Sequence, residues 1–252
     1  MRFLFVLIAS FLFFNLSVAA TPEEDVEQYV KIFSSNSNPV FHSDAVDTLE
    51  WKGLSDTRLF DIIEQRLQTD FVVGNYDKME KNRVARYMRA LGYSGQQKYA
   101  ATLQRYVRDP VYGRYAEGAL KDLPIYQKWN PIISGRFSFD PKYSDDTNRI
   151  LNMLRSDDIF LQRIGAKRVY FTTQDKDVFD VLASLVSGRL KQSNYGDRES
   201  QDTFAWLVKA LGSSKDPQYV ALITEVANTT NSSAVSRHAK EALQKNYYIT
   251  IR

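Results

Sequence analysis

The sequence predicts an all-α protein, and three observations carry this prediction. Apolar residues recur at helical spacing along the chain, strand-like alternation is nearly absent, and the chain repeats itself. Val26, Tyr29, Val30 and Phe33, for example, lie three and four residues apart, so they share one face of a helix. Capping residues, prolines and glycines separate about twelve such segments, which we expect to pair as antiparallel helical hairpins.

The repetition has a period of about 120 residues. Residues 89–92 (Arg-Ala-Leu-Gly) return as residues 209–212 (Lys-Ala-Leu-Gly), and residues 59–63 return in similar form as residues 178–182. The pattern Ala-x-x-Ala-Leu at 116–120 likewise returns at 239–243. A fixed period of this kind is typical of architectures in which similar units stack. We expect a first half at 21–124 and a second half at 144–252, each with three hairpins.

The first twenty residues have the features of a secretory signal peptide. Arg2 precedes an apolar run at 3–14, and small residues at 18–20 allow cleavage before Thr21, or one residue earlier. A membrane anchor is the alternative, but the run is about 12 residues long, whereas a spanning helix needs about 20. We expect a protein that is exported, either to a periplasm or as a secreted protein, and that has no membrane span after cleavage.

The segment 125–143 is predicted to join the two halves. Residues 132–139 alternate in a way that fits a short hairpin or an extended crossover, with Pro131 and Pro141 at the edges. Elsewhere acidic residues stand where helices begin. Asp216 precedes Pro217 as a predicted N-cap, and the pairs at 145–146 and 157–158 are interpreted as caps rather than as catalytic carboxylates.

Several predicted hairpins carry an Asp in the turn and an Arg early in the second helix. The pairs are Asp77 with Arg83, Asp109 with Arg114, and Asp157 with Arg163. This pattern resembles the HEAT repeat family, and the resemblance extends over nearly all of the chain after residue 20. It implies a right-handed α-solenoid of about six hairpins, in which such pairs form a ladder between repeats. Tetratricopeptide repeats are the competing interpretation, but their period of 34 does not fit.

The sequence lacks the motifs of most classes of enzyme. The chain has no cysteine and only two histidines, His42 and His238, and it has no phosphate loop, HExxH or GxSxG sequence. We predict no catalytic residue, no metal site and no cofactor, and therefore a protein that is not an enzyme. Both histidines are interpreted as surface or turn residues. The sequons at Asn228 and Asn231 are interpreted as a polar turn.

Charge offers the best surface signal. Residues 77–121 hold ten basic against four acidic side chains, whereas the whole chain has 33 against 30. In a HEAT-like fold the second helix of each hairpin lines the concave face. We predict that this face binds a partner through five residues on such helices: Lys81, Arg86, Arg89, Lys167 and Arg168.

The predicted function is a non-catalytic scaffold or adaptor that binds another protein, with an acidic segment of the partner lying in the basic concave face. The alternative is an enzyme or enzyme accessory that acts on an envelope polymer through carboxylates, Arg and Tyr. A cluster of carboxylates with raised pKa in a cleft would favour this alternative. Export and a small net charge argue against nucleic acid as the ligand.

Overall fold

The computed structural model describes residues 22–35, 39–73, 78–172, 174–192 and 196–249, and over these residues it is helical without any β-strand. The predicted signal peptide lies outside the described residues. The first half contains α1 (Pro22–Ser34), α2 (Pro39–Lys52), α3 (Thr57–Val73), α4 (Lys78–Tyr93), the 3-10 helix η1 (Gln97–Tyr99), α5 (Ala100–Gln104) and α6 (Gly113–Ile133). The second half, preceded by η2 (Arg136–Ser138), contains α7 (Asp145–Arg155), α8 (Ile159–Phe171), α9 (Lys176–Leu190), α10 (Arg198–Gly212), η3 (Pro217–Tyr219), α11 (Val220–Thr229) and α12 (Ser233–Tyr247).

The helices form two layers of stacked hairpins. The second helices pack side by side, α2 on α4 and α4 on α6, then α8 on α10 and α10 on α12. Among the first helices, α1 packs on α3, α7 on α9, and α9 on α11. Each hairpin covers the apolar face of its neighbour, which no single hairpin could bury alone. The fold is therefore an all-α solenoid, as predicted.

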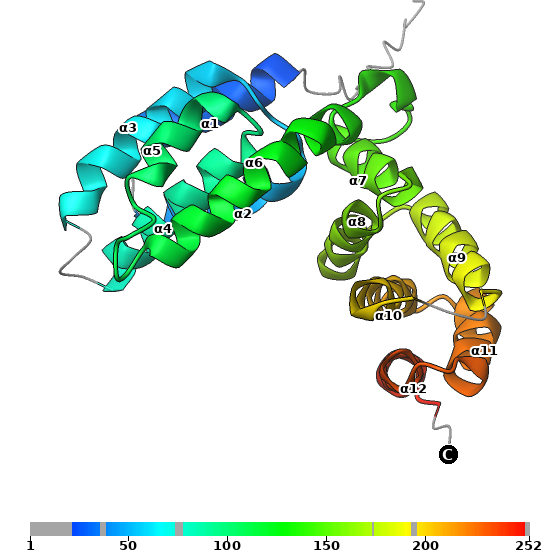
Figure 1. The fold of residues 1–252 in the computed structure, drawn as a ribbon. Coiled ribbons are helices and arrows are strands. Elements are labelled where there is room, and N and C mark those ends of the chain that lie inside the picture. Colours follow the sequence, from blue (N-terminus) through cyan, green and yellow to red (C-terminus); the bar gives the residue numbers. More distant parts are fainter. Residues whose placement is uncertain (1–21, 36–38, 74–77, 173, 193–195, 250–252) are drawn as a thin grey trace, which may run out of the picture.

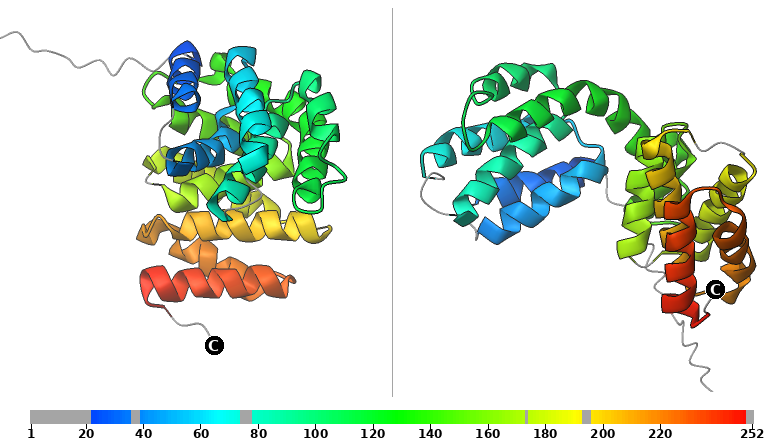
Figure 2. Two further views of the ribbon diagram at one scale, coloured as in Figure 1. Left: turned by 90° about the vertical axis from the view of Figure 1, so that its left-hand side faces the viewer. Right: turned by 60° about the horizontal axis from the view of Figure 1, so that its bottom comes forward.

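The two halves meet at an angle. In Figure 1 the chain bends where α6 is followed by α7, and the second helices α8, α10 and α12 lie on the inside of this bend. Figure 2 shows the same two blocks of helices from other directions. We call the surface formed by α2, α4, α6, α8, α10 and α12 the inner face.

Equivalent side chains make equivalent bonds in the two halves. The hydroxyl of Tyr99, in η1, donates to Oδ1 of Asp61 at 2.8 Å, and the hydroxyl of Tyr219, in η3, donates to Oδ1 of Asp180 at 2.7 Å. Each bond links the third hairpin of its half to the first helix of the second hairpin. The solenoid is thus a tandem duplication at the level of individual contacts.

The repeated glycines explain how tightly the second helices pack. A Cβ atom on Gly92 would lie 2.9 Å from the Cα atom of Ala119, and one on Gly212 would lie 2.7 Å from the Cβ atom of Ala242. Helices α4 and α6, and likewise α10 and α12, therefore approach each other at a point where both sequences need small residues. These are the residues that the 120-residue period brought into register.

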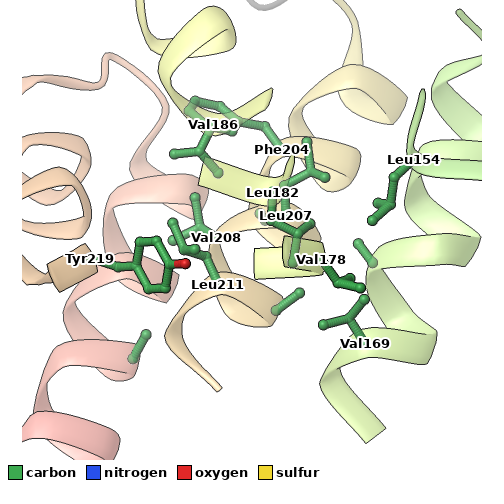
Figure 3. Close-up of a cluster of buried hydrophobic side chains, with 14 of the residues drawn as sticks. Leu154, Val169, Val178, Leu182, Val186, Phe204, Leu207, Val208, Leu211 and Tyr219 are labelled. Carbon is green, nitrogen blue, oxygen red and sulfur yellow. The ribbon is translucent and has the colours of Figure 1, made fainter. Parts of the chain in front are cut away.

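Two hydrophobic cores follow the two halves, except that Trp51 and Ile133 of the first half belong to the second core. Side chains of the second core converge from α7 to α12 and include Val178, Phe204 and Leu211, all of which are fully buried (Figure 3). The first core gathers residues of α1 to α6, with Tyr87 and Tyr99 among its largest buried side chains. Burial of apolar surface is the main stabilising term in each half.

A buried ion network ties the two halves together. Arg149 of α7 is 1% exposed and pairs with Asp25 of α1, and its Nη1 atom lies 2.8 Å from Oδ1 of Asp146. Nζ of Lys52, at the end of α2, lies 2.6 Å from the same atom of Asp146 and 3.7 Å from Asp25. Charges this deeply buried are tolerated only when they are paired. The network therefore holds α7 against the first hairpin.

The predicted linker at 125–143 is wrong over its first half. Helix α6 continues to Ile133 despite Pro124 and Pro131, and no hairpin of strands follows; a 3-10 turn connects α6 to α7. The helix persists because it buries one side, including Asn130, whose Nδ2 atom donates to the carbonyl of Leu54 at 3.1 Å. Both prolines lie on exposed positions, where a missing N–H costs least.

The predicted Asp–Arg ladder is not formed as expected. Arg83 pairs with Asp70 at 3.0 Å and Arg163 with Asp202 at 3.0 Å, while Asp77 lies outside the described residues. Asp109 accepts hydrogen bonds from backbone N–H groups, which caps its own turn. Arg163 takes its partner from α10, and Arg83 has one partner on α3 and another, Glu80, on its own helix. The predicted cap at Asp216 is present, since its side chain accepts from the N–H of residue 218.

Candidate functional site

The five predicted partner-binding residues lie on second helices, as expected, but their surroundings differ. Lys81, Arg86 and Arg89 belong to α4, whereas Lys167 and Arg168 belong to α8. The structure places them along one inner face, in two different halves. What each of the five residues contacts depends on the side chains of the neighbouring helices.

The duplication gives this face an internal comparison. Helix α8 repeats the burial pattern of α2 at an offset of 120 residues, and α10 aligns with α4 at the same offset. Helix α12 aligns with α6 at 123 through the Ala-x-x-Ala-Leu pattern. Five inner-face positions of the first half hold Asp47, Glu50, Arg86, Arg89 and Asp122, and their counterparts in the second half are Lys167, Tyr170, Trp206, Lys209 and Lys245.

These paired positions carry opposite charge. The first half has three carboxylates and two arginines at them, an excess of one negative charge, and the second half has three lysines and no carboxylate. Position for position, an ion pair between α2 and α4 is replaced by a cation and an aromatic ring between α8 and α10. At these five pairs of positions the unbalanced positive charge therefore lies in the second half.

In the first half Arg86 is already neutralised. Its Nη2 atom lies 3.0 Å from Oδ2 of Asp47, which belongs to α2. Arg89 is exposed and stacks over the ring of Tyr115, with its Cζ atom 5.3 Å from the ring centroid. Lys81 has no ion pair with any described residue. Of the three residues predicted on α4, the one that the structure pairs with a carboxylate is Arg86.

A cluster of polar side chains lies beside Arg89. Burial raises the pKa of Asp122, and the nearby charge of Glu50 raises it further, while Arg89 opposes the shift. Burial also raises the pKa of Tyr93, with Glu50 again contributing, and the ring of Tyr93 lies 4.9 Å from that of Tyr126. A carboxyl group in such surroundings holds its proton more readily than an exposed aspartate does. This cluster is a candidate for proton transfer.

In the second half two lysines surround an aromatic group. Nζ of Lys209 lies 3.9 Å from a ring centroid of Trp206 and 5.3 Å from that of Tyr170, and Nζ of Lys167 lies 5.2 Å from the Trp206 ring. The neighbouring Phe171 is 66% exposed. Within the described residues neither lysine has a carboxylate within 4.0 Å. We call these five residues the lysine–tryptophan cluster.

Arg168 lies at the junction of the two halves. Its Cζ atom lies 5.6 Å from the ring centroid of Trp51, which ends the first hairpin. The Nε atom of Arg168 is buried and has no hydrogen-bond partner among the described residues. Burial raises the pKa of the nearby Tyr126, and the positive charge of Arg168 opposes this shift.

The prediction that both histidines lie at the surface is wrong for His42. This residue is 4% exposed, its Nδ1 atom lies 2.6 Å from the hydroxyl of Tyr87, and its Nε2 atom lies 3.0 Å from the carbonyl of Ile32. His238 is partly exposed and bonds to Glu241 on the same helix. In the described part of the chain, no three His, Asp or Glu side chains are grouped as a metal site would need.

Comparisons with known proteins do not identify a family for this chain. No family model matches the chain, and no curated protein matches it. A solved structure of human deoxyhypusine hydroxylase in complex with glycerol matches with a TM-score of 0.35 and 13% identity, covering 90% of this chain and 85% of that one. The matched protein is an enzyme, which contradicts our prediction that this chain is not one, and we withdraw it. At this TM-score the match carries no argument for a particular activity.

None of the described helices is long and apolar enough to cross a membrane.

The sequence analysis missed Tyr170, Trp206 and Lys209 as site residues. The sequence contained a signal for them, because the 120-residue period makes them the equivalents of Glu50, Arg86 and Arg89.

Proposed function

We propose that the chain is an exported, HEAT-like repeat protein that binds an acidic segment of another protein on its inner face. The HEAT-like assignment is supported by hairpins stacked in two layers, with arginines that pair between neighbouring second helices. The proposal of export is supported by the sequence of residues 1–20. A scaffold or adaptor role follows from the extended surface that such a solenoid offers.

The lysine–tryptophan cluster is the observation that carries the proposal. Within the described residues Lys167 and Lys209 have no carboxylate partner, and they lie next to an indole ring and the exposed ring of Phe171. Aromatic side chains are enriched at protein interfaces, where they supply buried area, and charges that complement those of the partner give specificity. An acidic segment that carries an apolar residue would complement both.

The test is in-cell cross-linking of the tagged chain, followed by mass spectrometry of the exported fraction. The variant is Lys167→Glu/Lys209→Glu, and the matched control is Arg155→Glu/Lys191→Glu, which reverses one exposed charge at the end of α7 and one directly after α9. We expect one protein to be captured by the wild type and the control and lost in the Lys167→Glu/Lys209→Glu variant. Equal capture by all three chains would contradict the proposed surface.

A second candidate function is favoured by Asp122. Its raised pKa, together with the nearby Glu50 and Arg89, gives the inner face of the first half the carboxylate cluster that action on an envelope polymer would need. The test is release of soluble fragments from purified cell wall by the wild type and by Asp122→Asn. Release by the wild type that is lost in the variant would support this function, and no release by the wild type would argue against it.

A further inference from the structure

We infer that the groove between α4 and α6 binds a sugar that carries one phosphate or carboxylate group. The inference does not depend on the proposed acidic partner, and it supplies a ligand class for the second candidate function. The groove has a volume of about 460 Å³, which is within the range of sites for small molecules. Its lining includes Arg89, Tyr93, Arg114, Tyr115 and Asp122.

Two guanidinium groups are held next to each other in this groove. The Cζ atom of Arg89 lies 5.3 Å from the ring centroid of Tyr115, and that of Arg114 lies 4.6 Å from it. Nη2 of Arg114 also donates to the Tyr115 hydroxyl at 2.6 Å. The two Cζ atoms can therefore be no more than about 10 Å apart, and both guanidinium groups lie within cation–π distance of the same ring.

Neither guanidinium is neutralised by an ion pair. Within the described residues no carboxylate lies within 4.0 Å of Arg89 or Arg114. Asp122, the one acidic residue in the lining, leaves the groove with an excess of one positive charge. Guanidinium forks match the paired oxygens of carboxylate and phosphate groups, so one oxyanion would neutralise the excess.

The rest of the lining suits hydroxyl groups. The carboxylate of Asp122 can accept hydrogen bonds from a ligand hydroxyl, and the Tyr93 ring offers an apolar surface beside it. A free inorganic ion would use the arginines but neither of these residues. A sugar with one anionic group uses all of them.

The second half shows how this groove can be closed. The equivalent groove between α10 and α12 has a volume of about 160 Å³ and includes Glu241, which replaces Gly118 of α6. Glu241 forms an ion pair with Arg237 at 3.7 Å and a hydrogen bond with Nδ1 of His238 at 2.8 Å, and these two residues correspond to Arg114 and Tyr115. The first groove is open because Gly118 has no side chain, and a Cβ atom there would meet nothing within 4 Å.

This difference supplies a matched pair of variants. Gly118→Glu copies the second half, so the new carboxylate should pair with Arg114 and fill the groove. Gly118→Ala adds only a methyl group that touches nothing. Both changes replace glycine inside a helix and should preserve or raise stability. Should Gly118→Glu melt below the wild type, the exposed Arg114→Gln change tests the same contact.

The experiment is isothermal titration calorimetry of the mature chain with glucose 6-phosphate, glucuronate, inorganic phosphate and glucose. We expect saturable binding of one of the two anionic sugars, at least about tenfold tighter than binding of glucose or of inorganic phosphate. Glucose 6-phosphate and glucuronate distinguish a phosphate group from a carboxylate. Gly118→Glu should weaken binding at least about tenfold, and Gly118→Ala should stay within about twofold of the wild type.

Three results would overturn the inference: no saturable binding of either anionic sugar, equal binding of glucose or of inorganic phosphate, or unchanged binding by Gly118→Glu. The Lys167→Glu/Lys209→Glu variant should bind the sugar as the wild type does, because its charges belong to the other half. Loss of the captured protein and loss of sugar binding are thus separate outcomes.

Discussion

The burial of His42 predicts how the stability of the first half depends on pH. Burial lowers the pKa of His42, and the positive charges of Arg66 and Arg83 lower it further, while its hydrogen bond to the carbonyl of Ile32 opposes them. In the unfolded chain this pKa should be about 6.5. Between the two pKa values the unfolded state binds more protons than the folded state, so the free energy of unfolding rises with pH across this window.

The size of the effect can be bounded. If His42 stays neutral in the folded state at pH 5.5, lowering the pH from 7.5 to 5.5 removes at most about 1.4 kcal/mol, or about 3–6 °C in Tm. The assay is urea unfolding across this range for the wild type, for His42→Gln and for His238→Gln. Glutamine is chosen because Gln162 is the equivalent of His42 in the second half.

We expect the rise of the unfolding free energy with pH to be reduced in His42→Gln by the share that His42 contributes, and to be unchanged in His238→Gln, whose histidine is partly exposed. The His42→Gln chain should also be less stable at pH 7.5, by about 1 kcal/mol, because the bond to the Tyr87 hydroxyl is lost or weakened. An unfolding free energy that does not change with pH in the wild type, or an equal slope in His42→Gln, would refute this reasoning.

Three further predictions concern other parts of the solenoid. Tyr99→Phe and Tyr219→Phe should each cost about 1 kcal/mol in urea unfolding, because each removes one hydrogen bond to an aspartate; a cost at one site alone would contradict the equivalence of the halves. Arg149→Met should cost about 3 kcal/mol, since it leaves a buried carboxylate short of a partner, and a loss below about 1 kcal/mol would show that the junction depends on other contacts. Glu50→Gln should lower the pKa of Asp122 toward its ordinary range in an NMR titration, and an unchanged value would remove the coupling between these two groups.

The all-α solenoid was predictable because the same pattern of helices occurs twice in the sequence. A helical period can be read from apolar spacing, and the 120-residue repeat placed Gly92 and Gly212 in register before any contact was known. The structure shows why these positions repeat, since each glycine allows a close approach to an alanine of the next second helix. A small residue at a helix crossing leaves a strong signal in the sequence.

The wrong predictions about the linker and about the free arginines have one physical cause. Side chains form contacts with helices that are distant in the sequence. The prolines of α6 indicate a break, but burial of Asn130 against the ends of other helices keeps the segment helical. Arg86 looks like a free surface charge until α2 brings Asp47 to it. Such pairings depend on the packing of hairpins, and charge counts along the chain do not contain them.

Comparison of the halves corrects the sequence-based view of the inner face. The local surplus of basic residues at 77–121 pointed to the first half, where Asp47 neutralises Arg86. The unpaired lysines that face aromatic rings lie in the second half, at Lys167 and Lys209. Equivalent positions of the two halves can differ in charge because none of them is fully buried.

The central claim is that the inner face of the second half is the binding surface, and site-specific photo-cross-linking tests it most directly. A photo-reactive residue replaces Phe171 in one chain and Val72 in another; both side chains are 66% exposed, but Val72 belongs to α3, a first helix. We predict that the Phe171 position captures one exported protein, that the Val72 position does not, and that Lys167→Glu/Lys209→Glu abolishes the capture. Equal capture from both positions, or capture that survives the charge reversal, would contradict the account.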